Sequence, residues 1–359
     1  KSCSRTMYEP NVKHGKGQKL ESLKLLMSEG KDIVSTHALF HNIDNELISL
    51  IHSGGYTLIL DEVMNMIEIR QISYDDWLGL LAYNRFEIKE DNKIVWLDDD
   101  YSGDFEWMKQ LAKSDNLYVH KRNSLETGKV QLLIWTFPII SFTCFDEVYI
   151  LTYMFDYQIQ KYYFDTYELK YIKKSVNAIC DNKYTLTDYD LSEELEYRKQ
   201  FIDLISIYEG KLNNIGDDTF ALSSTWLKTH KKELKLLKNN TENYFIHIIN
   251  SPSKFNMWTT IKGTEQISRN KTEDNVKKAL SGKSYTRGFV SCNARATNDY
   301  INKTACAYLL NRFINPMELA FFQDKGIEIN QDAWAVSELI QWLFRSAIRN
   351  EQLINVYIP

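Results

Sequence analysis

Short apolar runs bounded by turn residues recur along the chain and predict buried β-strands. Residues 56–60 form the clearest run, which reads Tyr-Thr-Leu-Ile-Leu and follows Gly54 and Gly55. Similar runs occupy residues 148–151 and 354–358. Because these runs are mostly apolar, they are typical of strands in a parallel sheet that is covered on both faces.

Segments with apolar residues at helical spacing separate these runs. One of them stops at Gly30, a residue that often ends helices. The predicted helices span residues 21–29, 191–208, 225–238, 299–312, 316–325 and 332–349. The alternation of strands and helices predicts an α/β fold. Residues 86–97 and 117–135 instead predict two antiparallel hairpins.

The length and the order of the predicted elements favour two domains. A chain of 359 residues exceeds the usual size of one domain. We expect a first domain over residues 1–155, with a hairpin insertion at about 85–135, and a second domain over residues 156–359. The chain opens with Lys1 and closes on an apolar run, so we expect it to be part of a longer polypeptide.

Composition narrows the possible functions. The net charge is −5, from 43 basic and 48 acidic residues, so any binding of nucleic acid requires local basic patches. The 5 cysteines are scattered without a Cys-x-x-Cys pair, which favours reduced thiols in a cytoplasmic protein. No apolar run approaches the roughly 18 residues that a membrane helix needs.

Two adjacent carboxylates follow the first apolar run. Ligand groups in parallel sheets lie at the carboxyl ends of the strands, where Asp61 and Glu62 fall. In a nucleotide hydrolase one carboxylate anchors Mg²⁺, usually through water, and the next activates the attacking water. A structural strand end is the alternative interpretation of this short pattern.

The predicted helix 332–349 carries a second candidate group. Gln341, Arg345 and Arg349 lie at i, i+4 and i+8, which places them on one helix face with a drift of about 40° per step. Guanidinium groups suit phosphoryl oxygens because they present fixed planar donors and stay charged. A solvated helix face that pairs with carboxylates is the alternative.

Five short motifs occur in the order found in superfamily 2 helicases. They are Thr36-His37, Leu58 to Glu62, Leu151-Thr152, Asn293 to Asp299, and Gln341 to Arg349. The chain therefore resembles the DEAD/DEAH-box-like helicases that phages and mobile elements of Gram-positive bacteria carry. The resemblance implies two RecA-like parallel-sheet domains that bind ATP and Mg²⁺ between them. It also implies a helicase or translocase that acts in DNA replication in the host cytoplasm.

The resemblance assigns roles to individual residues. It makes Asp61 the Mg²⁺ residue, acting through water, and Glu62 the residue that activates the attacking water. Gln341 and either Arg345 or Arg349 become the γ-phosphate sensors, with the arginine as the finger. The positions that it assigns to nucleic acid, or to its coupling with ATP, are Thr36, His37, Thr152 and Arg295.

Two departures from the family pattern limit this expectation. Phe344 stands where the last motif has Gly, and its second arginine comes one residue late. No Gly-x-x-x-x-Gly-Lys-Ser/Thr occurs in the 359 residues, and Gly282-Lys283-Ser284 is only a partial match. The resemblance implies a phosphate-binding loop before Lys1, so we expect little hydrolysis by this chain alone.

Basic and aromatic residues supply further candidates for nucleic-acid contacts. Lys228 and Lys231 belong to a lysine-rich segment that begins near Trp226 and could follow phosphates. Trp258 and Thr260 lie near a predicted strand end, where an aromatic ring could stack on a base. A solvated helix face and a core tryptophan are the respective alternatives. We expect DNA rather than RNA.

Two rival functions remain open at this stage. The first is a degenerate helicase-like module that binds nucleic acid or protein without turnover. The second is a DNA-packaging motor ATPase with the same core.

Overall fold

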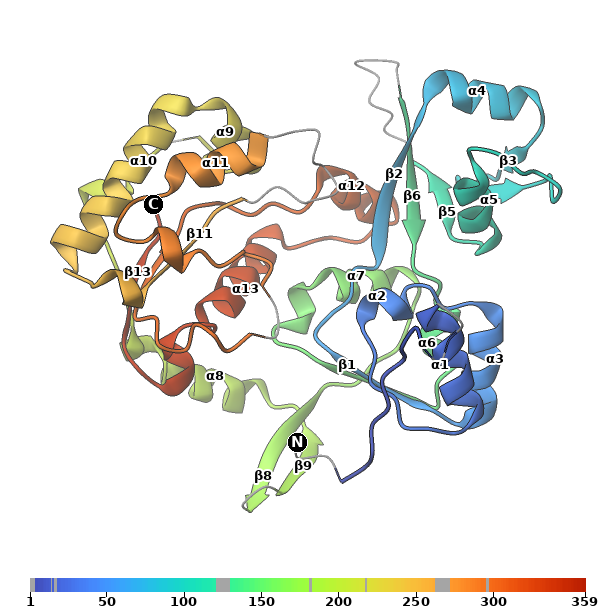
Figure 1. Ribbon diagram of the computed structural model, residues 1–359, viewed down its shortest axis with the longest axis horizontal. Coiled ribbons are helices and arrows are strands. Elements are labelled where there is room, and N and C mark those ends of the chain that lie inside the picture. Colours follow the sequence, from blue (N-terminus) through green and yellow to red (C-terminus); the bar gives the residue numbers. More distant parts are fainter. Residues whose placement is uncertain are drawn as a thin grey trace. The chain divides into compact units, whose positions relative to one another are not determined.

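The computed structural model describes residues 4–13, 15, 18–120, 130–180, 183–216, 218–261, 272–294 and 297–359. The chain divides into two compact units (Figure 1). Unit 1 comprises Lys1–Leu169 and Asn315–Ile329, and unit 2 comprises Lys170–Ile314 and Asn330–Pro359. The predicted boundary at residue 155 lies near the end of the first segment, whereas the return of residues 315–329 to unit 1 was not predicted.

Unit 1 combines short helices with a parallel strand pair and antiparallel strands. Its helices are α1 (Lys19–Ser28), α2 (His37–Phe40), α3 (Asn45–Gly54), α4 (Tyr74–Ala82), α5 (Glu106–Lys113), α6 (Ile140–Thr143), α7 (Ile159–Thr166) and α12 (Pro316–Asp324), with a 3₁₀ turn η1 (Phe155–Tyr157). Its strands are β1 (Thr57–Asp61), β2 (Ile67–Ser73), β3 (Phe86–Ile88), β4 (Ile94–Trp96), β5 (Leu117–Val119), β6 (Val130–Thr136) and β7 (Glu147–Leu151).

The strands of unit 1 form three small sheets. β1 and β7 pair in parallel, with Thr57 opposite Glu147 and Asp61 opposite Leu151. β2, β6 and β5 form an antiparallel sheet, and β3 pairs with β4 in a hairpin. The two predicted strand pairings, β3 with β4 and β5 with β6, are therefore confirmed. A RecA-like sheet is not confirmed for unit 1, because β1 and β7 form its only parallel sheet among the described residues.

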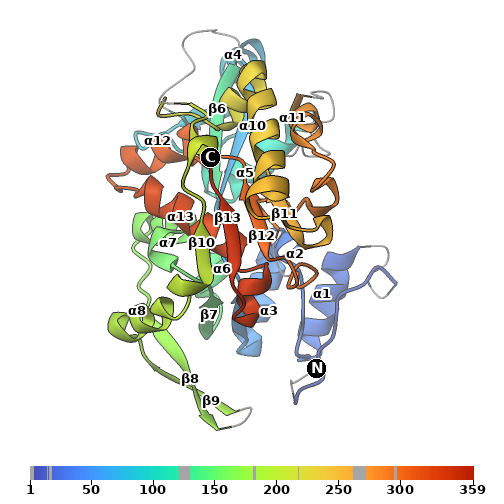
Figure 2. The same cartoon turned by 90° about the vertical axis from the view of Figure 1, so that its left-hand side faces the viewer.

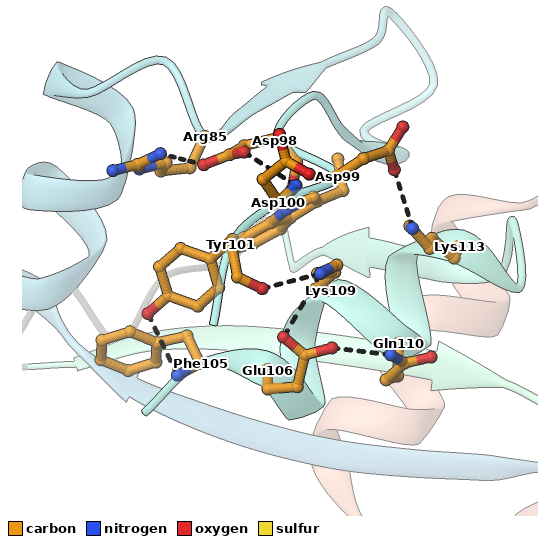
Figure 3. Close-up of polar contacts among 11 residues, drawn as sticks. Arg85, Asp98, Asp99, Asp100, Tyr101, Phe105, Glu106, Lys109, Gln110 and Lys113 are labelled. Carbon is orange, nitrogen blue, oxygen red and sulfur yellow. Dashed lines mark hydrogen bonds and ion pairs between the residues drawn. The ribbon is translucent and has the colours of Figure 1, made fainter. Parts of the chain in front are cut away.

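The hairpin region is stabilised by ion pairs around an acidic run (Figure 3). Asp98 accepts a hydrogen bond from Arg85, and Asp99 pairs with Lys113 at 2.7 Å. Lys109 is only 7% exposed, and its Nζ donates to the carbonyl of Tyr101 at 2.7 Å. The run therefore connects the hairpin to α5.

α12 belongs to unit 1 because its aromatic residues pack into the core of that unit. The ring of Phe321 lies 6.1 Å from that of Tyr118, and the ring of Phe322 lies 6.1 Å from that of Tyr162. Phe322 is fully buried. Burial of such rings contributes about 1.5–3 kcal/mol each, which fixes this distant segment to unit 1.

Unit 2 contains a parallel sheet, its crossover helices and one separate hairpin. Its helices are α8 (Leu191–Lys199), α9 (Ser224–Thr229), α10 (Lys231–Asn243), α11 (Thr272–Leu280) and α13 (Gln331–Leu343). Its shorter turns are η2 (Ile202–Leu204), η3 (Lys211–Asn213), the π-helical η4 (Tyr244–Ile248), η5 (Ser253–Phe255), η7 (Thr286–Gly288) and η8 (Ala347–Asn350). Its strands are β8 (Lys174–Cys180), β9 (Lys183–Asp188), β10 (Ile205–Ile207), β11 (Asn256–Thr259), β12 (Ala305–Tyr308) and β13 (Ile354–Tyr357).

Four of these strands lie side by side in the order β10, β13, β12, β11, and all pairs are parallel (Figure 2). The connection from β10 to β11 runs across the sheet in one direction, and the connection from β12 to β13 runs back. Since such crossovers are right-handed, we expect α9 and α10 of the first connection and α13 of the second to cover opposite faces of the sheet. Burial on both faces explains why β11 and β12 consist entirely of buried residues.

Two of the helices predicted in this half contain β-strands in the structure. Residues 305–308, predicted as helix, form β12, and residues 205–207, also predicted as helix, form β10. The run around β12 reads Ala-Cys-Ala-Tyr-Leu-Leu, and a short apolar run has no period that separates a buried strand from a helix. The predicted strand at the end of the chain is confirmed as β13.

Candidate functional site

The carboxyl end of the β1–β7 pair brings the acidic residues and Thr152 to the same end of one sheet. The register places Asp61 opposite Leu151, and the amide of Glu62 donates to the carbonyl of Leu151 at 2.9 Å. Thr152 directly follows Leu151, the last residue of the neighbouring strand. The predicted position of these residues at one strand end is therefore confirmed, while their chemical roles remain predictions.

The side chains at this end are available to a ligand to different degrees. Asp61 is exposed and Glu62 is half-buried. Glu62 has φ of +79°, a left-handed conformation that is rare for residues other than glycine and occurs often at functional sites. The hydroxyl of Thr152 is buried and has no hydrogen-bond partner in the part of the chain that the structure describes.

These groups include side-chain types that a magnesium-bound nucleotide site uses. Mg²⁺ in nucleotide sites takes one or two carboxylates and completes its shell with water and phosphate oxygens. Asp61 could supply such a carboxylate, and the Thr152 hydroxyl lacks the partner that a bound group would provide. No group of three or more metal-ligating side chains occurs among the described residues.

Gln160 supports the loop that follows the acidic residues, and sequence reasoning missed it. It lies on α7, is fully buried, and its Oε1 accepts a hydrogen bond from the amide of Met64 at 2.9 Å. Its Nε2 is buried without a hydrogen-bond partner among the described residues. No local pattern connects two residues 96 positions apart, so the sequence held no signal for this contact.

Thr36 and His37 lie at the start of a short helix. The Oγ1 of Thr36 accepts a hydrogen bond from the amide of Leu39 at 3.3 Å, so Thr36 caps the amino end of α2. Thr36 is exposed and His37 is half-buried. A nucleic-acid role for either residue remains a prediction, and the capping bond gives Thr36 a structural role already.

The predicted face of Gln341, Arg345 and Arg349 does not form, because α13 ends at Leu343. The hydroxyl of Ser346 donates to the carbonyl of Leu343 at 2.6 Å, which competes with continuation of the helix. The three predicted residues therefore lie on α13, on the turn after it and on η8.

Each of these three side chains has a different environment. Arg349 is exposed, and its Nη1 donates to Oδ1 of Asn298 at 2.5 Å. Arg345 is 9% exposed. Both side-chain polar atoms of Gln341 are buried without a hydrogen-bond partner within the described ranges. Contact of either arginine with a γ-phosphate remains a prediction.

Two further candidates for nucleic-acid contacts have buried side chains. Trp258 is fully buried against Tyr285 and Phe289, with ring centroids 5.2 and 5.1 Å away. Thr260 is also fully buried and donates to the carbonyl of Leu309 at 3.2 Å. Neither side chain is accessible to a base, which corrects that prediction in favour of a core position. Arg295 lies outside the described residues.

The lysine-rich segment forms two helices rather than one. α9 ends at Thr229 and α10 begins at Lys231, because His230 leaves the helical conformation with ψ of 71° and stacks on Trp226 at 4.7 Å. Trp226 is 5% exposed, so it is a core residue rather than a stacking platform. Lys231 is exposed and Lys228 is half-buried, and their contact with phosphates remains a prediction.

Within the described residues, no helix has the length and apolar character required to cross a membrane.

Residues 199–359 match the family described as the YonV C-terminal Rossmann-like domain, and residues 67–135 match the YonV middle domain. The chain is similar to the SPbeta prophage-derived uncharacterized protein YonV of Bacillus subtilis (strain 168). The two are 42% identical over 371 residues, covering 100% of this chain and 85% of the relative. No solved structure matches the chain.

Proposed function

This chain belongs to the YonV family, and from the order of its motifs we propose that it is an ATP-dependent nucleic-acid helicase or translocase of superfamily 2 type. The prophage origin of the relative supports a role in a bacterial host cell. The observation that carries the proposal is the carboxyl end of β1 and β7, where Asp61 and Glu62 follow one strand and Thr152 follows its parallel neighbour.

The residues of unit 1 would divide the chemistry between them. Mg²⁺–ATP, when bound, supplies the phosphoanhydride bond whose hydrolysis drives movement. The carboxylate of Asp61 would hold a water ligand of the metal, and that of Glu62 would accept a proton from the attacking water. The Thr152 hydroxyl would hydrogen-bond to a group that responds to the state of the nucleotide. Gln160 would keep the loop after Glu62 in place through the amide of Met64.

A second candidate is a helicase-like module that binds nucleic acid without turnover. It is favoured by the absence of a Gly-x-x-x-x-Gly-Lys-Ser/Thr motif from the 359 residues. The interruption of the predicted arginine-bearing helix after Leu343 also favours it. The two candidates share nucleic-acid binding and differ in hydrolysis.

ATP hydrolysis by the natural full-length protein separates the two candidates. We expect hydrolysis that single-stranded DNA stimulates and that Glu62→Gln reduces by about 100-fold or more, as loss of a general base does. Glu147→Gln is a matched control, because Glu147 is exposed at the opposite end of the same strand pair. Absence of turnover from the unmodified protein would exclude the enzyme in favour of the module, whereas turnover that survives Glu62→Gln would contradict the role proposed for Glu62.

A further inference from the structure

A cavity of about 340 Å³ lies at the carboxyl ends of the strands in unit 2. Its walls are the loop that follows β10, the residues that follow β12 and β13, and one face of α13. Small molecules bind to open parallel sheets at this end of the strands, in pockets of about 300–1,000 Å³. The site therefore has the position and the size of a ligand pocket.

Apolar residues form more of the cavity wall than polar residues do, but only by a small margin. Apolar walls with a few polar groups are typical of sites that take organic rings. The apolar side chains of the wall include Ile215, Leu222, Leu310, Ala335, Val336 and Leu339.

The cationic side chain in the wall is already neutralised. Arg312 forms an ion pair with Glu338, whose side chain is 5% exposed. The guanidinium carbon of Arg312 also lies 4.9 Å from the ring centroid of Trp334. A phosphate group would have to compete with this buried carboxylate, and loss of one partner of a buried pair is costly. The wall therefore disfavours an anionic ligand.

The other polar groups of the wall suit a ligand with N–H donors. Asp218 is exposed and contributes a carboxylate, of which Oδ1 also accepts the amide of Phe220 at 2.8 Å. Asn311 contributes an exposed amide side chain. The hydroxyl of Tyr308 is buried and has no hydrogen-bond partner in the described ranges, so a ligand could complete its bonding.

An aromatic pair is adjacent in sequence to the lining residues. Phe220 precedes Ala221 and Phe313 follows Arg312, and their ring centroids lie 5.6 Å apart. Phe220 is 63% exposed, which leaves part of its ring open to solvent. An exposed aromatic face can stack on any planar heterocycle.

We propose that this cavity binds an uncharged heteroaromatic ring with N–H donors, which is the chemistry of a nucleobase. The base reaches the cavity either as a free nucleoside or as part of a single strand. The proposal rests on the walls of unit 2 alone, so it holds whether or not unit 1 hydrolyses ATP.

The test measures binding of adenosine and cytidine, and of a short single-stranded oligodeoxynucleotide, to the chain by calorimetry and ligand-observed NMR. Ala335→Trp fills the cavity from α13 and is expected to weaken binding about tenfold or more. Ala333→Trp places the same side chain two residues away on the same helix, outside the lining, and is expected to bind normally. Asn311→Ala, at an exposed position, is expected to weaken binding in a folded protein even if Ala335→Trp does not fold.

The outcomes distinguish the two sources and can overturn the proposal. Binding of free nucleosides that Ala335→Trp or Asn311→Ala weakens supports a nucleoside pocket. Binding of the oligonucleotide alone, with the same sensitivity, supports a base within a strand. Displacement of the bound nucleoside by tripolyphosphate would show an anion site instead. Equal binding in all variants, or no binding of either probe, would also contradict the proposal.

Discussion

The two units place carboxylates near the carboxyl ends of parallel strands in opposite electrostatic settings. In unit 1, Asp61 ends β1 and is exposed to solvent. In unit 2, Glu338 is buried on α13 and neutralises Arg312. A carboxylate at the end of a strand is thus left free to meet a metal ion, whereas a carboxylate on a covering helix neutralises a cation and suits an uncharged ligand. The difference depends on whether a second element supplies a partner.

The largest expected effect comes from breaking the neutralised pair. Glu338→Leu leaves the Arg312 guanidinium without its carboxylate, which costs about 3–5 kcal/mol when the pair is buried. We expect this loss in the free energy of unfolding of unit 2, measured by urea denaturation with Trp fluorescence. Adding Arg312→Met should restore most of the stability, because it removes the positive charge that has lost its carboxylate. A double variant as unstable as the single one would show that packing, not charge, explains the loss.

A smaller effect is expected at the loop that positions the acidic residues of unit 1. Gln160→Leu removes the acceptor of the buried Met64 amide, which costs about 1–3 kcal/mol for an unsatisfied buried donor. Hydrogen exchange of the Met64 amide in the native state should become faster, by a factor that corresponds to this loss of stability. Gln71→Leu, at an exposed position of β2, is the control and should change stability by less than about 0.5 kcal/mol. Unchanged protection at Met64 would contradict the assigned contact.

The smallest effect concerns an ion-pair cluster at the surface of unit 1. Lys24 on α1 lies 2.8 Å from Asp44, which also caps α3 by accepting the amide of Leu47. Hydrogen bonds to Lys24 and to the Leu47 amide outweigh desolvation, the largest single influence, and hold the pKa of Asp44 below its usual value. Its contribution to stability is therefore present above pH 3.8 and is lost as the pH falls further.

Asp44→Asn isolates this charge, because asparagine caps helices as well as aspartate does. We expect a loss of about 0.5 kcal/mol at pH 7 and low salt, since exposed pairs contribute little. The difference from the unmodified chain should disappear in acid and shrink at high salt. A difference that persists at low pH would mean that the cap, rather than the ion pair, had been damaged.

The sequence predicted features that depend on neighbouring residues. The strand β1 and the acids that follow it could be predicted because an apolar run, a Gly-Gly turn and two carboxylates are contiguous. The pairing of β3 with β4 could be predicted because the two strands and the turn between them are also contiguous. The parallel pairing of β7 with β1 was not predicted. Exposed residues recur along both strands, with Ile59 64% exposed, so the prediction that these strands are covered on both faces was wrong.

The features that were missed depend on partners far along the chain. The Gln160 contact with Met64 and the Arg312 pair with Glu338 join residues 96 and 26 positions apart. At the end of α13 the hydroxyl of Ser346 donates to the carbonyl of Leu343. The spacing of apolar residues does not predict such a bond. Trp258 lies on the edge strand β11, and its burial depends on Tyr285 and Phe289, which follow it in the sequence by 27 and 31 positions. Its strand-end position in the sequence suggested an exposed ring.

The return of α12 to unit 1 has a consequence for biosynthesis. The ribosome completes β10, β11 and β12 before it reaches Phe321 and Phe322, which the core of unit 1 requires. Unit 1 therefore cannot finish folding as the nascent amino-terminal half emerges, although domains commonly do so. Its final closure must wait until residue 329 has been translated, when most of unit 2 is already outside the ribosome.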